Sequence, residues 1–177
     1  ENAVTVAYSY IGPKLTYPIY YDGTIGQAKR HLTKTAEKIN EKYSDIKAYI
    51  SVNKALVTQA SAAIPIVPLY FAILYKVMKV QGTHEGCIEQ ISRLFHEKLF
   101  VEKPVTDEQG RIRMDDWELS DEVQDKVMEC WKNVTTENVA ELSDIDGYWQ
   151  DFYQMFGFHL DGVDYAKDVD LEVAIPS

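Results

Sequence analysis

The sequence predicts an α/β fold that forms the distal part of a doubly wound parallel sheet and becomes rich in helices toward the C-terminus. Residues 3–9 and 46–52 are short runs of apolar and β-branched residues, which is typical of strands. Between them, residues 24–42 carry apolar side chains at helical spacing. A strand, a helix and a strand in this order form a βαβ unit, whose two strands are parallel.

The individual elements follow from local signals. The first strand, residues 3–9, is apolar enough to be buried. Thr24 and Gln27 have the spacing of a capping box, which predicts Thr24 as the N-cap of the first long helix. Further along the chain we expect a helix over 69–79 that stops at Gly82, and a second helix over 83–99. A short strand over 111–114 and helices near 121–133, 136–142 and 144–156 should follow.

Composition bounds the class of protein. The chain has 177 residues and a net charge of −10, which argues against nonspecific binding of DNA or RNA. Residues 1–100 hold 12 basic and 8 acidic residues, whereas residues 101–177 hold 6 and 20. This asymmetry has two explanations: two solvated surfaces of opposite sign, or a basic half that faces an anionic ligand with the acidic half behind it.

Residues 55–75 form an uncharged run of 21 residues. A run of this length is typical of a membrane span. Pro65 and Pro68 would break a continuous helix, so we expect no membrane span here. The run is better explained as a buried core segment or as the wall of an apolar pocket.

The cysteines and histidines carry no recognisable chemistry. Cys87 and Cys130 lie 43 positions apart, which is neither a metal knuckle nor a disulfide framework. They fit a reducing, cytoplasmic compartment and are expected to be packing residues. The four histidines show no metal-ligand spacing, so we expect no metal site.

Tyr20 and Lys29 are the first candidates for chemistry. Lys29 lies at the rim of the apolar face of its helix, either with its stem along the surface or with its ammonium held inside a site. In one continuous helix, nine positions at about 100° each would place the two residues on opposite faces. We therefore predict that Tyr20 is non-helical and folds back over the helix. No glycine-rich phosphate loop is present in the sequence of residues 1–177.

Several segments of the chain match one known family, namely residues 8–13, 23–29, 51–61, 76–79, 84–91 and 113–118. Tyr20 and Lys29 add a Tyr-x8-Lys motif. Together these residues resemble the trans-2-enoyl-CoA reductases, close relatives of one class of bacterial enoyl-acyl-carrier-protein reductases, over almost the whole chain. The resemblance implies a Rossmann-type enzyme of which residues 1–177 are the C-terminal portion, with 55–100 as a substrate-pocket segment and 101–177 as an acidic helical tail.

The resemblance also implies roles for individual residues. Tyr20 and Lys29 match the catalytic pair, and Lys29 also binds the cofactor. Tyr10 matches a second tyrosine that contacts the substrate thioester. The implied cofactor is NADH, and the sequence leaves NADPH open because the phosphate-binding glycines lie outside this chain. The loop that touches the nicotinamide end of the cofactor matches Val57, Thr58 and Gln59.

Elementary chemistry suits these roles. Hydride addition to a 2-enoyl thioester places negative charge on the thioester oxygen, which a tyrosine hydroxyl can stabilise. A nearby lysine ammonium should lower the pKa of that tyrosine. The leading hypothesis is reduction of enoyl-CoA, with the N-terminal half of the enzyme as partner. Two alternatives stay open: the same reaction on acyl-carrier protein, and a non-catalytic helical binding module. The module would be favoured if Lys29 were exposed and distant from Tyr20.

Overall fold

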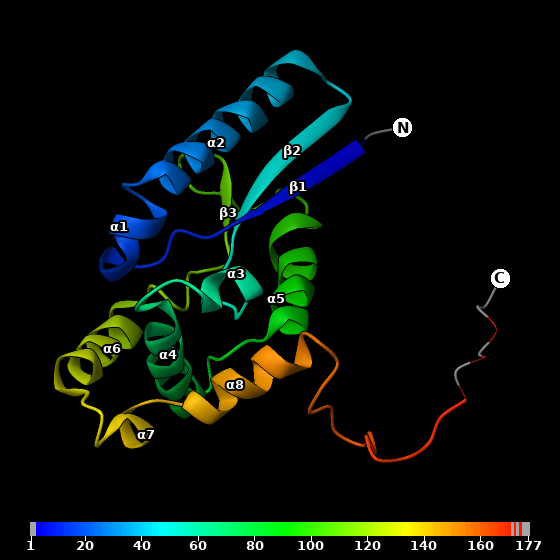
Figure 1. Cartoon of the computed structure of the whole chain (residues 1–177). Helices are drawn as coiled ribbons and strands as arrows, with labels where there is room; N and C mark the ends of the chain where they lie inside the picture. Colours follow the sequence, from blue (N-terminus) through cyan, green and yellow to red (C-terminus); the bar gives the residue numbers. More distant parts are fainter. Residues whose placement is uncertain (1–2, 171, 173, 175–177) are drawn as a thin grey trace.

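Three parallel strands form the sheet of this protein. The computed structural model describes residues 3–170, 172 and 174. The strand order is β1-β2-β3, and the register pairs Ala3 with Ile46 and Ser9 with Val52. The predicted parallel βαβ unit is therefore confirmed (Figure 1). The strands are β1 (Ala3–Ser9), β2 (Ile46–Val52) and β3 (Arg111–Arg113).

The helices that the sequence predicts occur in the expected order, with small differences in extent, and two short helices, Tyr17–Tyr20 and Gln59–Ala62, were not predicted. The helix expected over 83–99 begins at Cys87 and continues as a π-helical segment, and the one expected over 136–142 is a single turn. The helices are α1 (Tyr17–Tyr20), α2 (Thr24–Lys42), α3 (Gln59–Ala62), α4 (Val67–Gln81), α5 (Cys87–Arg93), α6 (Asp121–Asn133), α7 (Val139–Leu142) and α8 (Ile145–Gln154), with a 3₁₀ turn η1 (Lys14–Thr16) and the π-helical segment η2 (Leu94–Leu99).

Helices cover both faces of the sheet. Side chains alternate along a strand, so neighbouring residues point to opposite faces. On one face, Ile50 and Val52 of β2 pack against Ala36 of α2. On the other face, Ile112 of β3 packs against Leu94 of η2. The doubly wound α/β class that the sequence predicts is confirmed.

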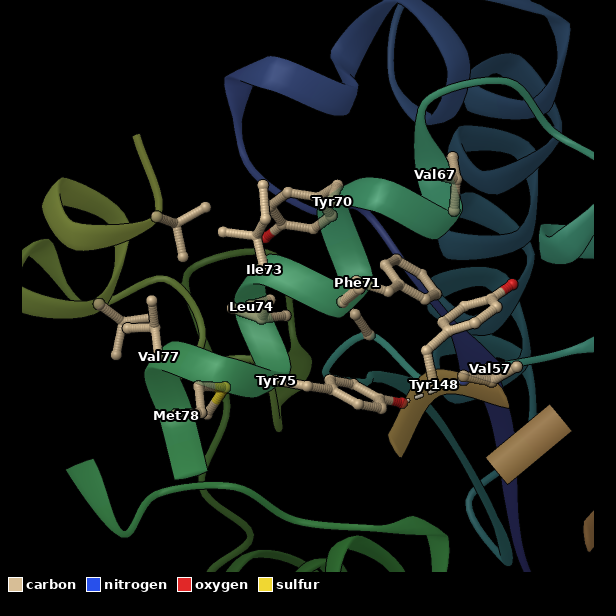
Figure 2. Packing of buried hydrophobic residues seen from close by; sticks show 14 of the residues in the cluster. Val57, Val67, Tyr70, Phe71, Ile73, Leu74, Tyr75, Val77, Met78 and Tyr148 are labelled. Carbon is tan, nitrogen blue, oxygen red and sulfur yellow. Dashed lines mark hydrogen bonds between the residues drawn. The ribbon is translucent and has the colours of Figure 1, made fainter. Parts of the chain in front are cut away.

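The uncharged run contains the centre of the main hydrophobic core. Helix α4 is buried on almost every side and packs against α6 and α8, beyond the carboxyl ends of the strands (Figure 1). Figure 2 shows Tyr148 of α8 beside Phe71 and Val57 in this cluster. The core alternative is therefore confirmed. None of the helices in the described residues is both long and apolar enough to cross a bilayer.

Pro68 does not interrupt α4, because it lies in the first turn, where a helix needs no N–H donor. The helix ends at Gly82, whose φ of 70° is in the left-handed region that favours glycine. The predicted stop at Gly82 is confirmed. The start is two residues earlier than expected, since the proline is tolerated at this position.

Two local expectations are wrong. Strand β1 is largely exposed, with Tyr8 53% accessible, because β1 pairs with β2 on one side only within the described residues. Thr24 is the first helical residue and not the N-cap; Gly23 is the N-cap and makes no side-chain capping bond. A capping box does occur at α3, where the Thr58 side chain accepts from the Ser61 amide.

The two cysteines differ in their surroundings. Cys130 packs against the main core, as expected of a packing residue. Cys87 is exposed, so the expectation that it packs inside the protein is wrong. Its position as the first residue of α5, next to the N-cap Gly86, places it at a helix end on the surface.

Candidate functional site

Tyr10, Tyr20 and Lys29 meet beside the carboxyl end of β1. The Lys29 ammonium donates a hydrogen bond to the backbone carbonyl of Tyr10. It also lies 4.8 Å from the centroid of the Tyr20 ring and 5.7 Å from that of Tyr10. The two tyrosine rings contact edge to face, with centroids 5.0 Å apart. Open parallel sheets bind ligands at this end of the strands.

Two separate helices bring Tyr20 and Lys29 together. Tyr20 is the last residue of the short helix α1, so the prediction that it is non-helical is wrong. Lys29 lies in the second turn of α2, as predicted. The chain reverses between the two helices, over residues 21–23 (Figure 1). This reversal removes the conflict that a single continuous helix would create.

The reversal depends on a close approach at Gly26. A Cβ atom built on Gly26 would lie 1.8 Å from the backbone oxygen of Tyr21, which a real side chain never tolerates. A side chain at this position must therefore push α1 away from α2. Gly26 is thus the residue that lets Tyr20 lie over Lys29.

We expect the substitution Gly26→Ala to destabilise the protein by roughly 1–3 kcal/mol, the scale of overpacking. Helix propensity alone would predict a gain of about 1 kcal/mol, so the sign of the change is diagnostic. Thermal unfolding of the full-length protein provides the measurement. The matched control is Ala28→Gly on the exposed side of α2, which loses helix propensity without moving α1. A stabilised Gly26→Ala variant would contradict the close approach.

Burial shifts the pKa values of both Tyr20 and Lys29. The pKa of Tyr20 is raised, mainly by burial and further by the neighbouring phenol of Tyr148. The expectation that the lysine ammonium lowers this pKa is wrong, since the ammonium lies over the ring and binds the Tyr10 carbonyl. Burial lowers the pKa of Lys29 to about 8. Tyr20 therefore retains its proton at neutral pH and can donate it in a hydrogen bond.

The predicted nicotinamide loop lies at the start of α3. Val57 is buried in the same cluster as Tyr20, and its backbone N–H donates to the Tyr75 hydroxyl at 3.3 Å. Thr58 is the N-cap of α3 and is exposed, as is Gln59. The fold thus places Val57 with the tyrosines and the other two residues at the surface. Their contact with a cofactor stays a prediction.

Sequence reasoning missed one buried carboxylate. Glu118 is 0% exposed, and it accepts a hydrogen bond of 2.9 Å from the Tyr10 hydroxyl. It lies in the loop after β3, 108 residues from Tyr10. Residues 113–118 belong to the segments that match the reductases, but no spacing rule marks this acid. Glu118 could have been identified only if the order of the strands in the sheet were already known.

A cavity of about 450 Å³ opens beside the Tyr20–Lys29 pair, between α2 and β3. Arg30 and Lys34 line it, and neither forms an ion pair with any residue that the structure describes. Arg111 and Arg113 also line it, each paired with an aspartate. Basic residues from both 1–100 and 101–177 therefore line the cavity. The uncharged run 55–75 does not line it, and its role as a pocket wall stays a prediction.

Fold and site together define a Rossmann-type α/β protein with a tyrosine–lysine pair at the ligand-binding edge of its sheet. Residues 1–100 match the family model described as the trans-2-enoyl-CoA reductase catalytic region. Residues 106–169 match a second model, described as the enoyl reductase FAD binding domain. The chain belongs to the trans-2-enoyl-CoA reductase family.

Several relatives are more than half identical to the chain. An enoyl-[acyl-carrier-protein] reductase [NADH] of Cytophaga hutchinsonii is 57% identical over 99% of the chain and 45% of the relative. A trans-2-enoyl-CoA reductase of Euglena gracilis is 54% identical over 100% of the chain and 33% of the relative. The chain therefore spans less than half the length of these relatives.

Solved structures agree with this assignment. The trans-2-enoyl-CoA reductase of Treponema denticola in complex with NAD superposes with a TM-score of 0.90 and 50% identity, over 94% of this chain and 42% of that chain. The Clostridium acetobutulicum trans-2-enoyl-CoA reductase in complex with NADH gives a TM-score of 0.90 and 56% identity, over 94% and 43%.

Proposed function

We propose that this chain acts as the C-terminal part of a reductase that transfers hydride from NADH to the double bond of trans-2-enoyl-CoA. The observation that carries the proposal is the cluster of Tyr10, Tyr20 and Lys29 at the carboxyl end of a parallel sheet. Membership of the reductase family gives this cluster its chemical meaning. The cytoplasm is the compartment that we propose, because both cysteines are free.

The donors in the site suit a nicotinamide cofactor. Lys29 supplies an ammonium that can bind a ribose hydroxyl, and the loop from Val57 to Gln59 would contact the nicotinamide end. Bound NADH supplies the hydride. Preference for NADH over NADPH rests on the relatives, which are named or solved with NAD or NADH. The phosphate-binding residues are assigned to the N-terminal half of the enzyme.

In the proposed mechanism, Tyr20 stabilises the charge that develops on the substrate. Its raised pKa keeps the hydroxyl protonated, so it can donate to the thioester oxygen as that oxygen becomes enolate-like. Lys29 anchors the pair through the Tyr10 carbonyl and orients the cofactor. Because Tyr20 is buried, its hydrogen bond to the substrate acts in a medium of low dielectric constant, where it is stronger than in water.

A carrier-protein substrate is the second candidate, favoured by relatives named enoyl-[acyl-carrier-protein] reductase. Arg30 and Lys34 line the cavity beside Lys29 and form no ion pair within the described residues, so they suit the phosphates of CoA and support the first candidate. Steady-state rates of the full-length enzyme with crotonyl-CoA and crotonyl-carrier protein distinguish the two. A higher kcat/KM with the carrier protein would overturn the choice of CoA, and no NADH oxidation with either thioester would overturn the reductase itself.

The third hypothesis, a non-catalytic binding module, loses the observation that would favour it. A solvent-exposed Lys29 distant from Tyr20 would have supported this hypothesis. Instead, Lys29 is half-buried and its ammonium lies over the Tyr20 ring at 4.8 Å. We therefore do not retain this hypothesis.

We further propose that the N-terminal half of the enzyme covers the exposed side of β1. Val4 and Tyr8 are 46% and 53% exposed there, and an unpaired apolar strand edge promotes aggregation. Residues 1–177 expressed alone should therefore bind no NADH in a calorimetric titration and should be poorly soluble. A soluble, cooperatively unfolding fragment that binds NADH at micromolar concentration would contradict this proposal.

Activity should decline as the pH rises above about 8. The pKa of Lys29 is lowered to about 8, so its ammonium is present below that pH and is lost above it. Both kcat/KM and the affinity for NADH should fall over this range, by up to tenfold per pH unit for kcat/KM. Lys54 is buried with a similar pKa of about 8, so a control is needed. The residual activity of Lys29→Arg should lack the decline; an unchanged decline would assign it to Lys54.

A further inference from the structure

Glu118 joins segments that follow all three strands. Its Oε1 atom accepts hydrogen bonds from the hydroxyls of Tyr10, at 2.9 Å, and Tyr70, at 2.7 Å. Its Oε2 atom accepts a bond of 2.7 Å from the backbone N–H of Ala55. Tyr10 follows β1, Ala55 follows β2, Glu118 follows β3, and Tyr70 lies in α4. An ionised carboxylate only accepts hydrogen bonds, so it satisfies all three donors at once.

These contacts hold Tyr10 at both ends. Its hydroxyl is bound to Glu118, and its backbone carbonyl is bound to the Lys29 ammonium. Its ring contacts the ring of Tyr20 in an edge-to-face arrangement. The position of the catalytic pair thus depends on Tyr10, and the position of the Tyr10 ring depends on Glu118.

We propose that Glu118 is a positioning residue, which acts through the Tyr10 hydroxyl to hold Tyr10, and with it Tyr20 and Lys29, in the reactive arrangement. The proposal rests on the proposed reductase function. Because the Tyr10 hydroxyl donates to Glu118, that hydroxyl offers its lone pairs and not its proton to a substrate. Tyr20, whose hydroxyl is bound to no partner in the described residues, is then the donor to the thioester oxygen.

The Glu118 carboxylate satisfies three buried donors, but its burial also has a cost. A buried charge costs free energy relative to an apolar side chain of similar size. Burial raises the pKa of Glu118, while its three hydrogen bonds and the positive charge of buried Lys54 oppose that rise. The Lys54 ammonium donates to the carbonyls of Ala55 and Glu85 and makes no direct bond to Glu118. Glu118 is therefore held by donors whose positions matter to the site.

A double-mutant cycle in the full-length enzyme tests the proposal. Glu118→Gln should lower kcat roughly 10- to 100-fold, the scale of a small misplacement, with less change in KM for NADH. In a Tyr10→Phe background the same substitution should lower kcat less than about threefold, because its effect passes through the Tyr10 hydroxyl. The matched control is Glu85→Gln, a buried carboxylate that binds Arg93. It should lower the melting temperature, and its effect on kcat should be equal in both backgrounds.

A second measurement does not depend on activity. In protein labelled with ¹³C at tyrosine Cζ, the Tyr10 signal is the one that Tyr10→Phe removes. We expect this signal to shift in Glu118→Gln and to stay in place in Glu85→Gln. An inactive wild-type enzyme would overturn the reductase function, while the Tyr10 signal would still report whether Glu118 holds Tyr10. Additive losses in the cycle together with an unmoved signal would overturn the positioning role.

If Glu118→Gln does not fold, Glu118→Asp takes its place in both experiments. This variant keeps the charge and withdraws the carboxylate by one methylene group from Tyr10. The same coupling to Tyr10→Phe and the same shift of the Tyr10 signal are expected. Full activity of Glu118→Asp with an unmoved Tyr10 signal would overturn the proposal.

Discussion

Replacing Tyr20 with phenylalanine should lower the turnover of crotonyl-CoA by roughly 10²–10⁴-fold, the scale for losing a positioned proton donor. The ring and its contacts with Tyr10 and Lys29 remain, so the fold should be unchanged. The substitution removes only the hydroxyl that we propose as the donor to the thioester oxygen. The measurement is steady-state kinetics of the full-length enzyme, with the melting temperature as the check on folding.

Two further variants calibrate the Tyr20 result. Tyr10→Phe should be milder, since the Tyr10 hydroxyl is bound to Glu118 and contributes by position. Tyr43→Phe, at the C-terminal end of α2 and outside the site, should leave turnover unchanged. Near-normal turnover of Tyr20→Phe would remove Tyr20 from the mechanism.

Lys29→Met should reduce both turnover and the affinity for NADH, because one ammonium serves two purposes. In the proposed mechanism it orients the cofactor, and in the structure it binds the Tyr10 carbonyl and lies over the Tyr20 ring. We expect a loss of at least about 10²-fold in kcat/KM, the scale on which misplaced reacting groups lose rate. Methionine retains the length and apolar stem of lysine, so packing of the stem is preserved.

Calorimetric titration with NADH separates the two effects of Lys29→Met. The dissociation constant reports the loss of cofactor binding, and kcat at saturating NADH reports the loss of orientation. Lys38→Met, an exposed lysine on the same helix, is the matched control and should change neither. A Lys29→Met variant with normal kcat at saturating NADH would restrict the role of Lys29 to binding.

The order of the elements was predictable from the sequence because its signals are local. Alternation of apolar residues marks β2, and apolar residues at helical spacing mark α2, whichever neighbours surround them. Gly82 ends α4 because glycine readily adopts the left-handed conformation that terminates a helix. The residue pattern marked Tyr20 and Lys29 as candidates, and the family motif implied their roles. The angular conflict between the two residues correctly indicated that they do not share one helix.

What the sequence by itself determined, then, is the α/β class, the order of the predicted elements and a set of candidate site residues. Tertiary structure alone decided how those candidates lie relative to one another. Lys29 lies over the Tyr20 ring and not at its hydroxyl, so burial raises the tyrosine pKa where charge was expected to lower it. Glu118 reaches Tyr10 across 108 residues. Such contacts depend on which strand ends are neighbours in the sheet. The periodicity of the sequence reports local structure and does not reveal which distant residues lie close together in space.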